Sequence, residues 1–222
     1  MAAGQFVVFY PVAMAKELAL LDALKGPHSH LQLAGIGKVN AALATQQAIW
    51  RWHPSLVVSI GTSGGIGPGL TPGDLVAGAR YTYHDVWCGE GNLPGQIQEL
   101  PQYYPGDSAS IDILRHQTLQ RVQLGDFACG EHFIPSPEKI AAIHRDFPQA
   151  IAVDMESTAV AQTCHLAGIP FIGLRVISDT PGSQHNHSAQ YQQFWQQEAV
   201  AAFARLTDLA NLLCAQRAAH RQ

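Results

Sequence analysis

Three carboxyl groups follow predicted strands and could perform acid–base chemistry. Glu17 comes after a strand predicted over 6–10, Glu156 after one predicted over 150–153, and Asp179 after one predicted over 171–177. A carboxylate at the start of a helix is stabilised in its charged form, whereas apolar neighbours raise the pKa of a carboxyl group. One group can then hold a proton while another accepts one. The pattern predicts an acid and a base, although each residue alone also fits an ordinary helix-start Glu or turn Asp.

Neutral polar groups accompany these carboxylates. The stretch Gly61-Thr62-Ser63-Gly64-Gly65 follows a strand predicted over 56–60, and Ser178 precedes Asp179. Glycines allow a ligand to approach the backbone closely, and hydroxyl groups can donate or accept hydrogen bonds. A charged Glu156 could accept hydrogen bonds from two neighbouring hydroxyls, such as a ribose diol. The stretch matches neither GxGxxG nor GxxxxGK[ST], which disfavours dinucleotide and nucleoside triphosphate binding. An ordinary strand-to-loop turn is the alternative.

The elements that must position these groups alternate along the chain. Strands are predicted over 6–10, 31–34, 56–60, 74–83, 122–128, 150–153 and 171–177, and helices over 14–24, 39–52, 111–120, 137–146, 156–166 and 189–217. This alternation predicts one α/β domain over 1–222, with a largely parallel central sheet and a ligand site at the carboxyl ends of its strands. The irregular segment 84–106 is long enough to suggest a functional or interfacial role.

Composition excludes several classes of protein. Hydrophobic residues make up 47% of the chain, too many for a disordered protein, and the net charge of −4 comes without a basic stripe. Nucleic acid and membrane surfaces are therefore not expected as partners. Charged residues make up only 14%, against about a quarter in average domains, which favours association between copies.

The cysteines and histidines bear on compartment and cofactors. The four cysteines are far apart and form no CxxC pair, which predicts free thiols in the cytoplasm. The N-terminus does not match a signal peptide. The histidines form no HExxH motif, and the isolated His185-Asn186-His187 is not expected to bind metal. We therefore expect neither a metal nor another cofactor.

The order of these motifs along the chain resembles the 5′-methylthioadenosine/S-adenosylhomocysteine nucleosidases of the nucleoside phosphorylase superfamily. The resemblance extends over nearly the whole chain. Its motifs are Met14-x-x-Glu17, Gly35-Ile36-Gly37-Lys38-Val39-Asn40, the 61–65 stretch, Tyr83-His84-Asp85, Gly130-x-x-Phe133-Ile134, Val153-Asp154-Met155-Glu156 and Arg175-x-Ile177-Ser178-Asp179. The last two motifs at this spacing are the most specific. The resemblance implies a nucleoside phosphorylase-like three-layer sandwich with a mixed, largely parallel sheet.

It also implies an activity and a role for each matched residue. Relatives of this kind hydrolyse the N-glycosidic bond of 5′-substituted adenosines and release adenine. Asp179 would be the general acid that protonates the purine at N7, with Ser178 orienting it, and Glu17 would be the base that activates water. Thr62 occupies a position near the acid where the family usually has a serine.

The remaining matched positions would bind the substrate. Glu156 would bind the ribose hydroxyls and Met155 would pack against the sugar. Phe133 would stack on the adenine, while the backbone of Ile134 would read its edge. Two further predicted site residues are Met14, from the first motif, and Arg175, which would help to order the site.

The resemblance also implies a homodimer. In relatives, the segment that corresponds to 86–94 lines the pocket for the 5′-substituent across a dimer interface, which adds Pro94 to the predicted site. This segment is shorter than usual here, so the preference among methylthioadenosine, S-adenosylhomocysteine and 5′-deoxyadenosine stays open.

Two other functions remain as alternatives. Bacterial hexameric phosphorylases hold phosphate with an arginine just ahead of the glycine-rich stretch, where this chain has Ser59, and no arginine lies between Arg51 and Arg80. The sequence therefore favours a hydrolase over a phosphorylase, with a futalosine-type hydrolase left open. A nucleoside-binding protein without activity is the third hypothesis, and the complete set of three carboxyl groups argues against it.

Overall fold

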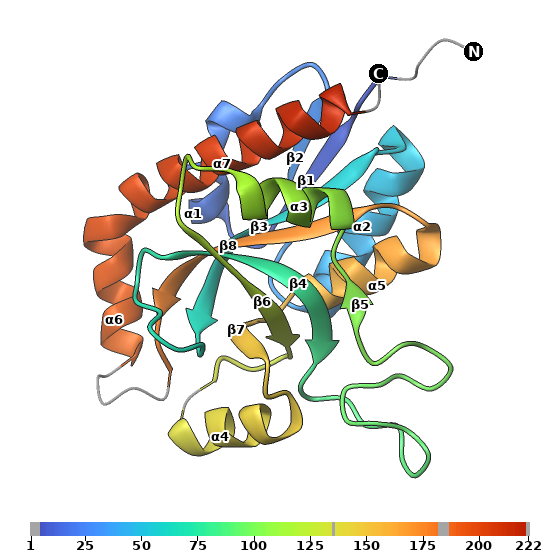
Figure 1. Cartoon of the computed structure of the whole chain (residues 1–222), viewed down its shortest axis with the longest axis vertical. Helices are drawn as coiled ribbons and strands as arrows, with labels where there is room; N and C mark the ends of the chain where they lie inside the picture. Colours follow the sequence, from blue (N-terminus) through green and yellow to red (C-terminus); the bar gives the residue numbers. More distant parts are fainter. Residues whose placement is uncertain (1–4, 135, 182–186, 221–222) are drawn as a thin grey trace.

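A mixed sheet of eight strands forms the centre of the computed structural model, which describes residues 5–134, 136–181 and 187–220 (Figure 1). The strands are β1 (Val8–Val12), β2 (Ser29–Leu33), β3 (Leu56–Gly65), β4 (Leu75–Tyr83), β5 (Tyr104–Pro105), β6 (Val122–Cys129), β7 (Ala150–Asp154) and β8 (Phe171–Asp179). The helices are α1 (Ala15–Leu18), η1 (Asp22–Leu24), α2 (Lys38–Trp52), α3 (Ser108–His116), α4 (Pro137–Asp146), α5 (Ser157–Ala167), α6 (His187–Gln193), η2 (Phe194–Glu198) and α7 (Ala199–Ala219).

Five of these strands pair side by side in a closed ring. The strands β3, β7, β6, β4 and β8 pair in that order, and β8 returns to pair with β3. The pairs β3–β8, β4–β6 and β6–β7 are parallel, whereas β3–β7 and β4–β8 are antiparallel. Strands β1 and β2 extend the sheet from β3, and β5 adds to β4. The observed sheet is thus mixed and largely parallel, as predicted, and its central strands form a barrel.

Helices cover the two faces of the sheet and bury two main apolar cores, and a third, smaller core includes residues of α4. One core joins α7, α3 and η1 to residues such as Val58 and Leu174, and the other joins α2 and α5 to residues such as Val57 and Phe127. Figure 1 shows α7 and α3 along one side of the strands and α2 and α5 on the other. Because Val57 and Val58 point to opposite faces and both are buried, the first part of β3 needs apolar residues on both of its sides. The predicted three-layer α/β fold is confirmed.

Several predicted elements differ from the observed ones. The helix predicted over 111–120 spans Ser108–His116, and β5 lies within the segment predicted to be irregular. The strand predicted over 56–60 continues to Gly65, because β8 and β7 pair with its glycine-rich end. The helix predicted over 14–24 stops at Leu18, where tighter hydrogen bonds from residue i to residue i−3 take over. The final predicted helix is interrupted by the π-helical turn η2.

Within the described residues, no helix is long and apolar enough to cross a membrane.

Candidate active site

A cavity of about 450 Å³ opens where the ends of β3, β7 and β8 meet the segment that follows β1. This is the predicted carboxyl end of the parallel strands. Nine residues predicted for the site line the cavity, namely Met14, Glu17, Thr62, Phe133, Met155, Glu156, Arg175, Ser178 and Asp179. Residues from distant parts of the chain thus meet in one place.

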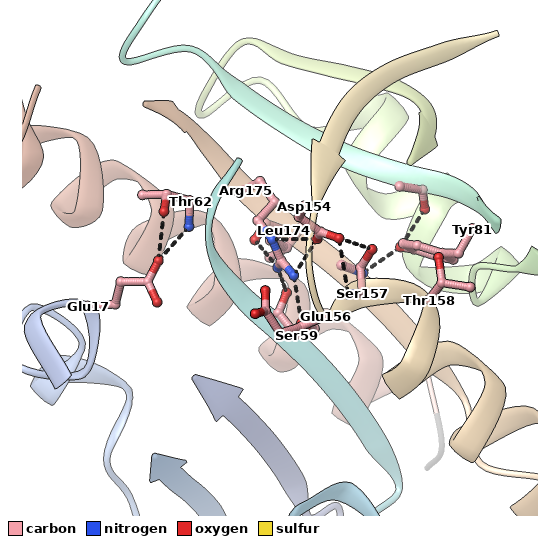
Figure 2. A network of polar contacts seen from close by, with 12 residues as sticks. Glu17, Ser59, Thr62, Tyr81, Asp154, Glu156, Ser157, Thr158, Leu174 and Arg175 are labelled. Carbon is pink, nitrogen blue, oxygen red and sulfur yellow. Dashed lines mark hydrogen bonds and ion pairs between the residues drawn. The ribbon is translucent and has the colours of Figure 1, made fainter. Parts of the chain in front are cut away.

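Glu17 is a buried carboxylate held by three hydrogen bonds. Its side chain is in α1, and the residue is only 2% exposed. The backbone N–H and the hydroxyl of Thr62 both donate to Oε1 at 2.8 Å, and the N–H of Met14 donates to Oε2 at 3.1 Å. Figure 2 shows the carboxylate facing Thr62 on β3. Burial raises the pKa of Glu17, opposed by the Thr62 hydrogen bonds, the charge of Arg175 and the Met14 hydrogen bond.

The glycine at position 61 makes room for this carboxylate. A Cβ atom on Gly61 would lie 2.8 Å from Oε1 of Glu17, closer than such atoms normally approach. Gly61 therefore lets β3 pass directly beside α1, so that Thr62 can reach Glu17. This is a close backbone approach of the kind that the glycine-rich stretch predicts.

Asp179 ends β8 on the same cavity. It is 2% exposed, and all nine residues of β8 are buried because this strand lies between β3 and β4. The hydroxyl of Ser178 lies 2.7 Å from Oδ1 of Asp179 and 3.3 Å from the carbonyl oxygen of Ser63, and it can donate to either. The strand and the hydroxyl together fix the direction of the Asp179 carboxyl group.

Glu156 follows β7 in the chain and immediately precedes α5, and its side chain reaches the first residues of α2. The N–H of Gly37 donates to its Oε1 at 2.7 Å. Burial and the neighbouring charge of Asp154 raise the pKa of Glu156 to about 7, against the opposing effects of Gly37 and Arg175. Because both α2 and α5 begin here, their N-terminal partial charges favour a carboxylate at this point.

A buried ion pair fixes the floor of the cavity. Arg175 is 3% exposed, and its Nη2 lies 2.9 Å from Oδ2 of Asp154. Its guanidinium also donates to the carbonyl oxygen and hydroxyl of Ser59 and to the carbonyl oxygen of Leu174. The other oxygen of Asp154 accepts hydrogen bonds from the N–H and hydroxyl of Ser157. Figure 2 shows this network joining β3, β7, β8 and α5.

Aromatic side chains close another part of the cavity. Phe133 contacts the ring of Tyr191 in α6, with 5.9 Å between ring centroids. The hydroxyl of Tyr191 lies 3.7 Å from the sulfur of Met14 and accepts a hydrogen bond from Lys16. Lys16 also places its ammonium group 3.9 Å from the centre of the Trp195 ring. These contacts join α6 and η2 to α1, which carries Glu17.

Thr62 lines the cavity together with the predicted acid Asp179, and it donates its hydrogen bonds to the predicted base Glu17. Two other predicted positions lie outside the main cavity. Ile134 is buried and does not line the main cavity; it borders a smaller hollow beside Phe133 and Asp179. Pro94 is exposed on the segment between β4 and β5 and lines neither space. Within one subunit the structure therefore does not bring Pro94 to the other site residues, and its predicted role depends on a second copy.

Several site residues were not found from the sequence. Lining residues such as Tyr191 and Gln192 have no distinguishing pattern in the sequence. In the sequence, Asp154 belongs to the Val153-Asp154-Met155-Glu156 motif with no role predicted for its side chain, and Ser59 is only the position at which an arginine is absent. The one available signal was the position of Asp154 at the end of a buried strand, where a charged residue requires a partner.

Comparisons with known proteins agree with this geometry. The sequence pattern of the Phosphorylase superfamily matches residues 16–211. A 5′-methylthioadenosine/S-adenosylhomocysteine nucleosidase of Baumannia cicadellinicola is 37% identical over 169 residues, which cover 74% of each chain. The corresponding protein of Anoxybacillus flavithermus is 34% identical over 182 residues, or 80% of this chain and 78% of that one.

Solved structures show the same likeness. The nucleosidase of Neisseria meningitidis in complex with methylthio-immucillin-A superposes with a TM-score of 0.82 at 29% identity, covering 92% of this chain and 98% of that one. The nucleosidase of Colwellia psychrerythraea in complex with adenine gives a TM-score of 0.83 at 26% identity, with 95% and 96% covered.

Proposed function

This chain belongs to the phosphorylase superfamily, among its 5′-methylthioadenosine/S-adenosylhomocysteine nucleosidases, and from that premise we propose that it hydrolyses the N-glycosidic bond of 5′-substituted adenosines. The products are adenine and the 5′-substituted ribose. The observation that carries the proposal is the meeting of Glu17, Glu156 and Asp179 in one cavity, the first and last buried and Glu156 partly buried, each from a different element.

Two of these carboxyl groups perform the chemistry. Adenine is a poor leaving group until N7 is protonated, and Asp179, oriented by Ser178, supplies that proton. As the bond breaks, positive charge develops on the sugar in an oxocarbenium-like transition state. Glu17 accepts a proton from the attacking water. Each such acid or base contributes roughly 10²–10⁴ in rate.

The third carboxylate holds the sugar. Glu156 accepts hydrogen bonds from the ribose hydroxyls while Gly37 holds its other side, and Met155 packs on the ring. Phe133 stacks on the base, and the backbone of Ile134 beside the adjoining hollow reads the edge of the purine. Arg175 positions the floor of the site through Asp154 and Ser59.

The hydrogen bonds that Arg175 already makes favour water over phosphate as the nucleophile. Arg175 is the arginine in the cavity wall, and its guanidinium already donates to Asp154, Ser59 and Leu174. A phosphate would have to displace these contacts and to approach the carboxylate of Glu17, which carries the same sign of charge.

Turnover in the absence of phosphate tests the reaction. We expect adenine release from methylthioadenosine, S-adenosylhomocysteine or 5′-deoxyadenosine at the same rate with and without added phosphate. The reason is that Arg175, the cationic group among the described residues that line the cavity, already donates its hydrogen bonds within the protein. A panel extended to adenosine, inosine and futalosine, followed by chromatography of the base, ranks the substrates. A sugar 1-phosphate product would establish a phosphorylase, and tight binding without turnover would establish a binding protein.

We also propose a homodimer. Six apolar side chains on α2 and its surroundings are each more than half exposed, namely Ile36, Val39, Leu43, Trp50, Trp87 and Leu93. The ion pair between Lys38 and Asp85 joins the start of α2 to the start of the segment that contains Trp87. A second copy covers this face and brings its own segment, with Pro94, toward the 5′-substituent. The cytoplasmic location stays a prediction.

The dimer has a direct test with a matched control. We expect light scattering at micromolar concentration to give about twice the subunit mass, since the exposed apolar face favours association. Val39→Asp on α2 places a charge in the interface and is expected to yield monomers. Val200→Asp on α7 changes an equally exposed valine outside that face and is expected to leave the dimer intact. A monomeric wild-type protein would contradict the proposal.

A further inference from the structure

The start of α2 is held by two carboxylates. The N–H of Gly37 donates to Oε1 of Glu156 at 2.7 Å, and the next N–H, that of Lys38, donates to Oε1 of Glu131 at 2.6 Å. The first N–H groups of a helix have no partner within the helix, so an acceptor outside must supply one. One acceptor belongs to the proposed ribose site, and the other comes from the segment after β6.

Glu131 is fixed in turn by its neighbours. Its backbone N–H donates to Oδ2 of Asp85 at 2.8 Å, and both carboxylate oxygens of Asp85 accept from the ammonium group of Lys38, at 2.9 and 3.0 Å. The side chains of Lys38 and Asp85 are 21% and 17% exposed. Lys38, Asp85 and the exposed Glu131 therefore form a network, called the α2 clamp, that joins α2 to the segments after β4 and β6.

Gly37 is shaped to fit between the two carboxylates. Its φ of 95° lies in the region that favours glycine, and a Cβ atom there would lie 2.8 Å from Oε2 of Glu131. The carboxylate of Glu131 thus occupies the space that a side chain at position 37 would take. The direction of the Gly37 N–H is set by the clamp on one side and by Glu156 on the other.

We propose that Lys38, Asp85 and Glu131 are positioning residues, which act through the Gly37 N–H to hold Glu156 in place for the ribose diol. This inference rests on the proposed function, because it assigns the diol to Glu156. The clamp touches neither substrate nor reacting atoms, so it acts on nucleoside binding rather than on the rate of bond cleavage.

The charges around Glu156 make the effect measurable by pH. Burial and the charges of Asp154 and Glu17 favour its protonated form, whereas the Gly37 N–H and the charge of Arg175 favour the ionised form that accepts from the diol. Loss of the Gly37 hydrogen bond therefore raises the pKa of Glu156. Removal of the Glu131 charge alone has the opposite effect, because it takes a negative charge away from the neighbourhood.

The experiment compares Glu131→Ala with Glu131→Gln. Alanine removes the acceptor for the Lys38 N–H, and we expect KM for methylthioadenosine to rise roughly five- to twentyfold, as for a weakened hydrogen bond to a charged group. We expect kcat to stay within about twofold, and the acid limb of kcat/KM to move to higher pH. Glutamine keeps an acceptor oxygen and is expected to restore most of the binding.

Adenine serves as the probe that lacks a diol. If the clamp acts through Glu156, the inhibition constant of adenine for Glu131→Ala stays within about twofold of the wild-type value, while the nucleoside binds more weakly. Glu138→Ala, which removes an exposed carboxylate from the first turn of α4, is the control and is expected to match wild type. An equal loss for adenine and nucleoside, an unchanged KM, or an acid limb at lower pH would overturn the inference.

The two proposals fail in distinguishable ways. Absence of adenine release by the wild-type protein contradicts the proposed reaction and leaves the clamp testable by calorimetry. In that case, adenosine and adenine are titrated into the wild-type and Glu131→Ala proteins. Selective weakening of adenosine supports the clamp, and equal affinities for adenosine in the two proteins overturn it.

Discussion

Replacing Asp179 by Asn is expected to lower kcat for adenine release by roughly 10²–10⁴, the range contributed by a positioned general acid. The amide has nearly the same shape as the carboxyl group, and its oxygen can still accept the hydrogen bond from Ser178. What is lost is the proton that N7 of adenine must receive. The measurement is single-turnover release of adenine by a protein whose circular dichroism and melting temperature match wild type.

A matched control removes a buried carboxylate elsewhere. Asp126 on β6 is 4% exposed and pairs with Arg80, outside the cavity. Asp126→Asn makes the same chemical change, and kcat is expected to stay near the wild-type value. If Asp179→Asn keeps more than about a tenth of the wild-type rate, Asp179 is not the general acid.

A change of leaving group separates the acid from the base. The 4-nitrophenyl glycoside of 5-methylthioribose has a leaving group that departs without protonation. With this substrate, Asp179→Asn is expected to regain most of the wild-type rate, because the missing proton is no longer required. A variant that lacks the base stays slow, since water must still be activated.

The fold and much of the site could be predicted because their signals are local. The continuous apolar runs of β3 and β8 identify strands buried on both faces, and Glu17, Glu156 and Asp179 each follow such a strand or begin the next helix. Parallel strands with helical crossovers bring those ends together. The chain order of the motifs then identified the family that the comparisons show.

The closure of the barrel could not be predicted in this way. It depends on antiparallel pairing of β3 with β7 and of β4 with β8, between segments far apart in sequence. The glycines at 64 and 65 suggested a loop because glycine is depleted in strands. In the structure they allow close packing, since a Cβ on Gly65 would lie 2.9 Å from Ile177.

The α2 clamp was missed for a similar reason. Asp85 and Glu131 lie in or beside motifs that carried the resemblance, yet no local pattern indicates that both contact the start of α2. Charged residues in loops are most often solvated, so their types alone predict nothing. Only the three-dimensional pairing of β4 with β6 brings the two segments together.

Replacing Glu17 by Gln is expected to lower kcat by roughly 10²–10⁴ for both the adenine and the nitrophenyl substrates. A glutamine oxygen can keep both hydrogen bonds from Thr62, so the contact between α1 and β3 is retained, although the amide nitrogen loses the bond that the N–H of Met14 donates to Oε2. The amide cannot take a proton from water. Loss of rate with both leaving groups is the result that distinguishes a base from an acid, and full activity with either would contradict the assignment.

The pH dependence of the same pair of proteins follows from burial. Burial raises the pKa of Glu17, and the base must be ionised, so kcat of the wild-type protein is expected to fall as pH drops through that raised pKa. The residual rate of Glu17→Gln is expected to lack this decrease at low pH.

The stability of the folded protein changes with pH in the opposite direction. A carboxyl group whose pKa is raised on folding stabilises the folded state at pH values below its pKa in the unfolded chain. This contribution is lost as the pH rises through the pKa of the folded state. Above that pKa the wild-type protein buries a charge that the glutamine variant does not, so Glu17→Gln is expected to melt no lower than wild type while losing nearly all its activity.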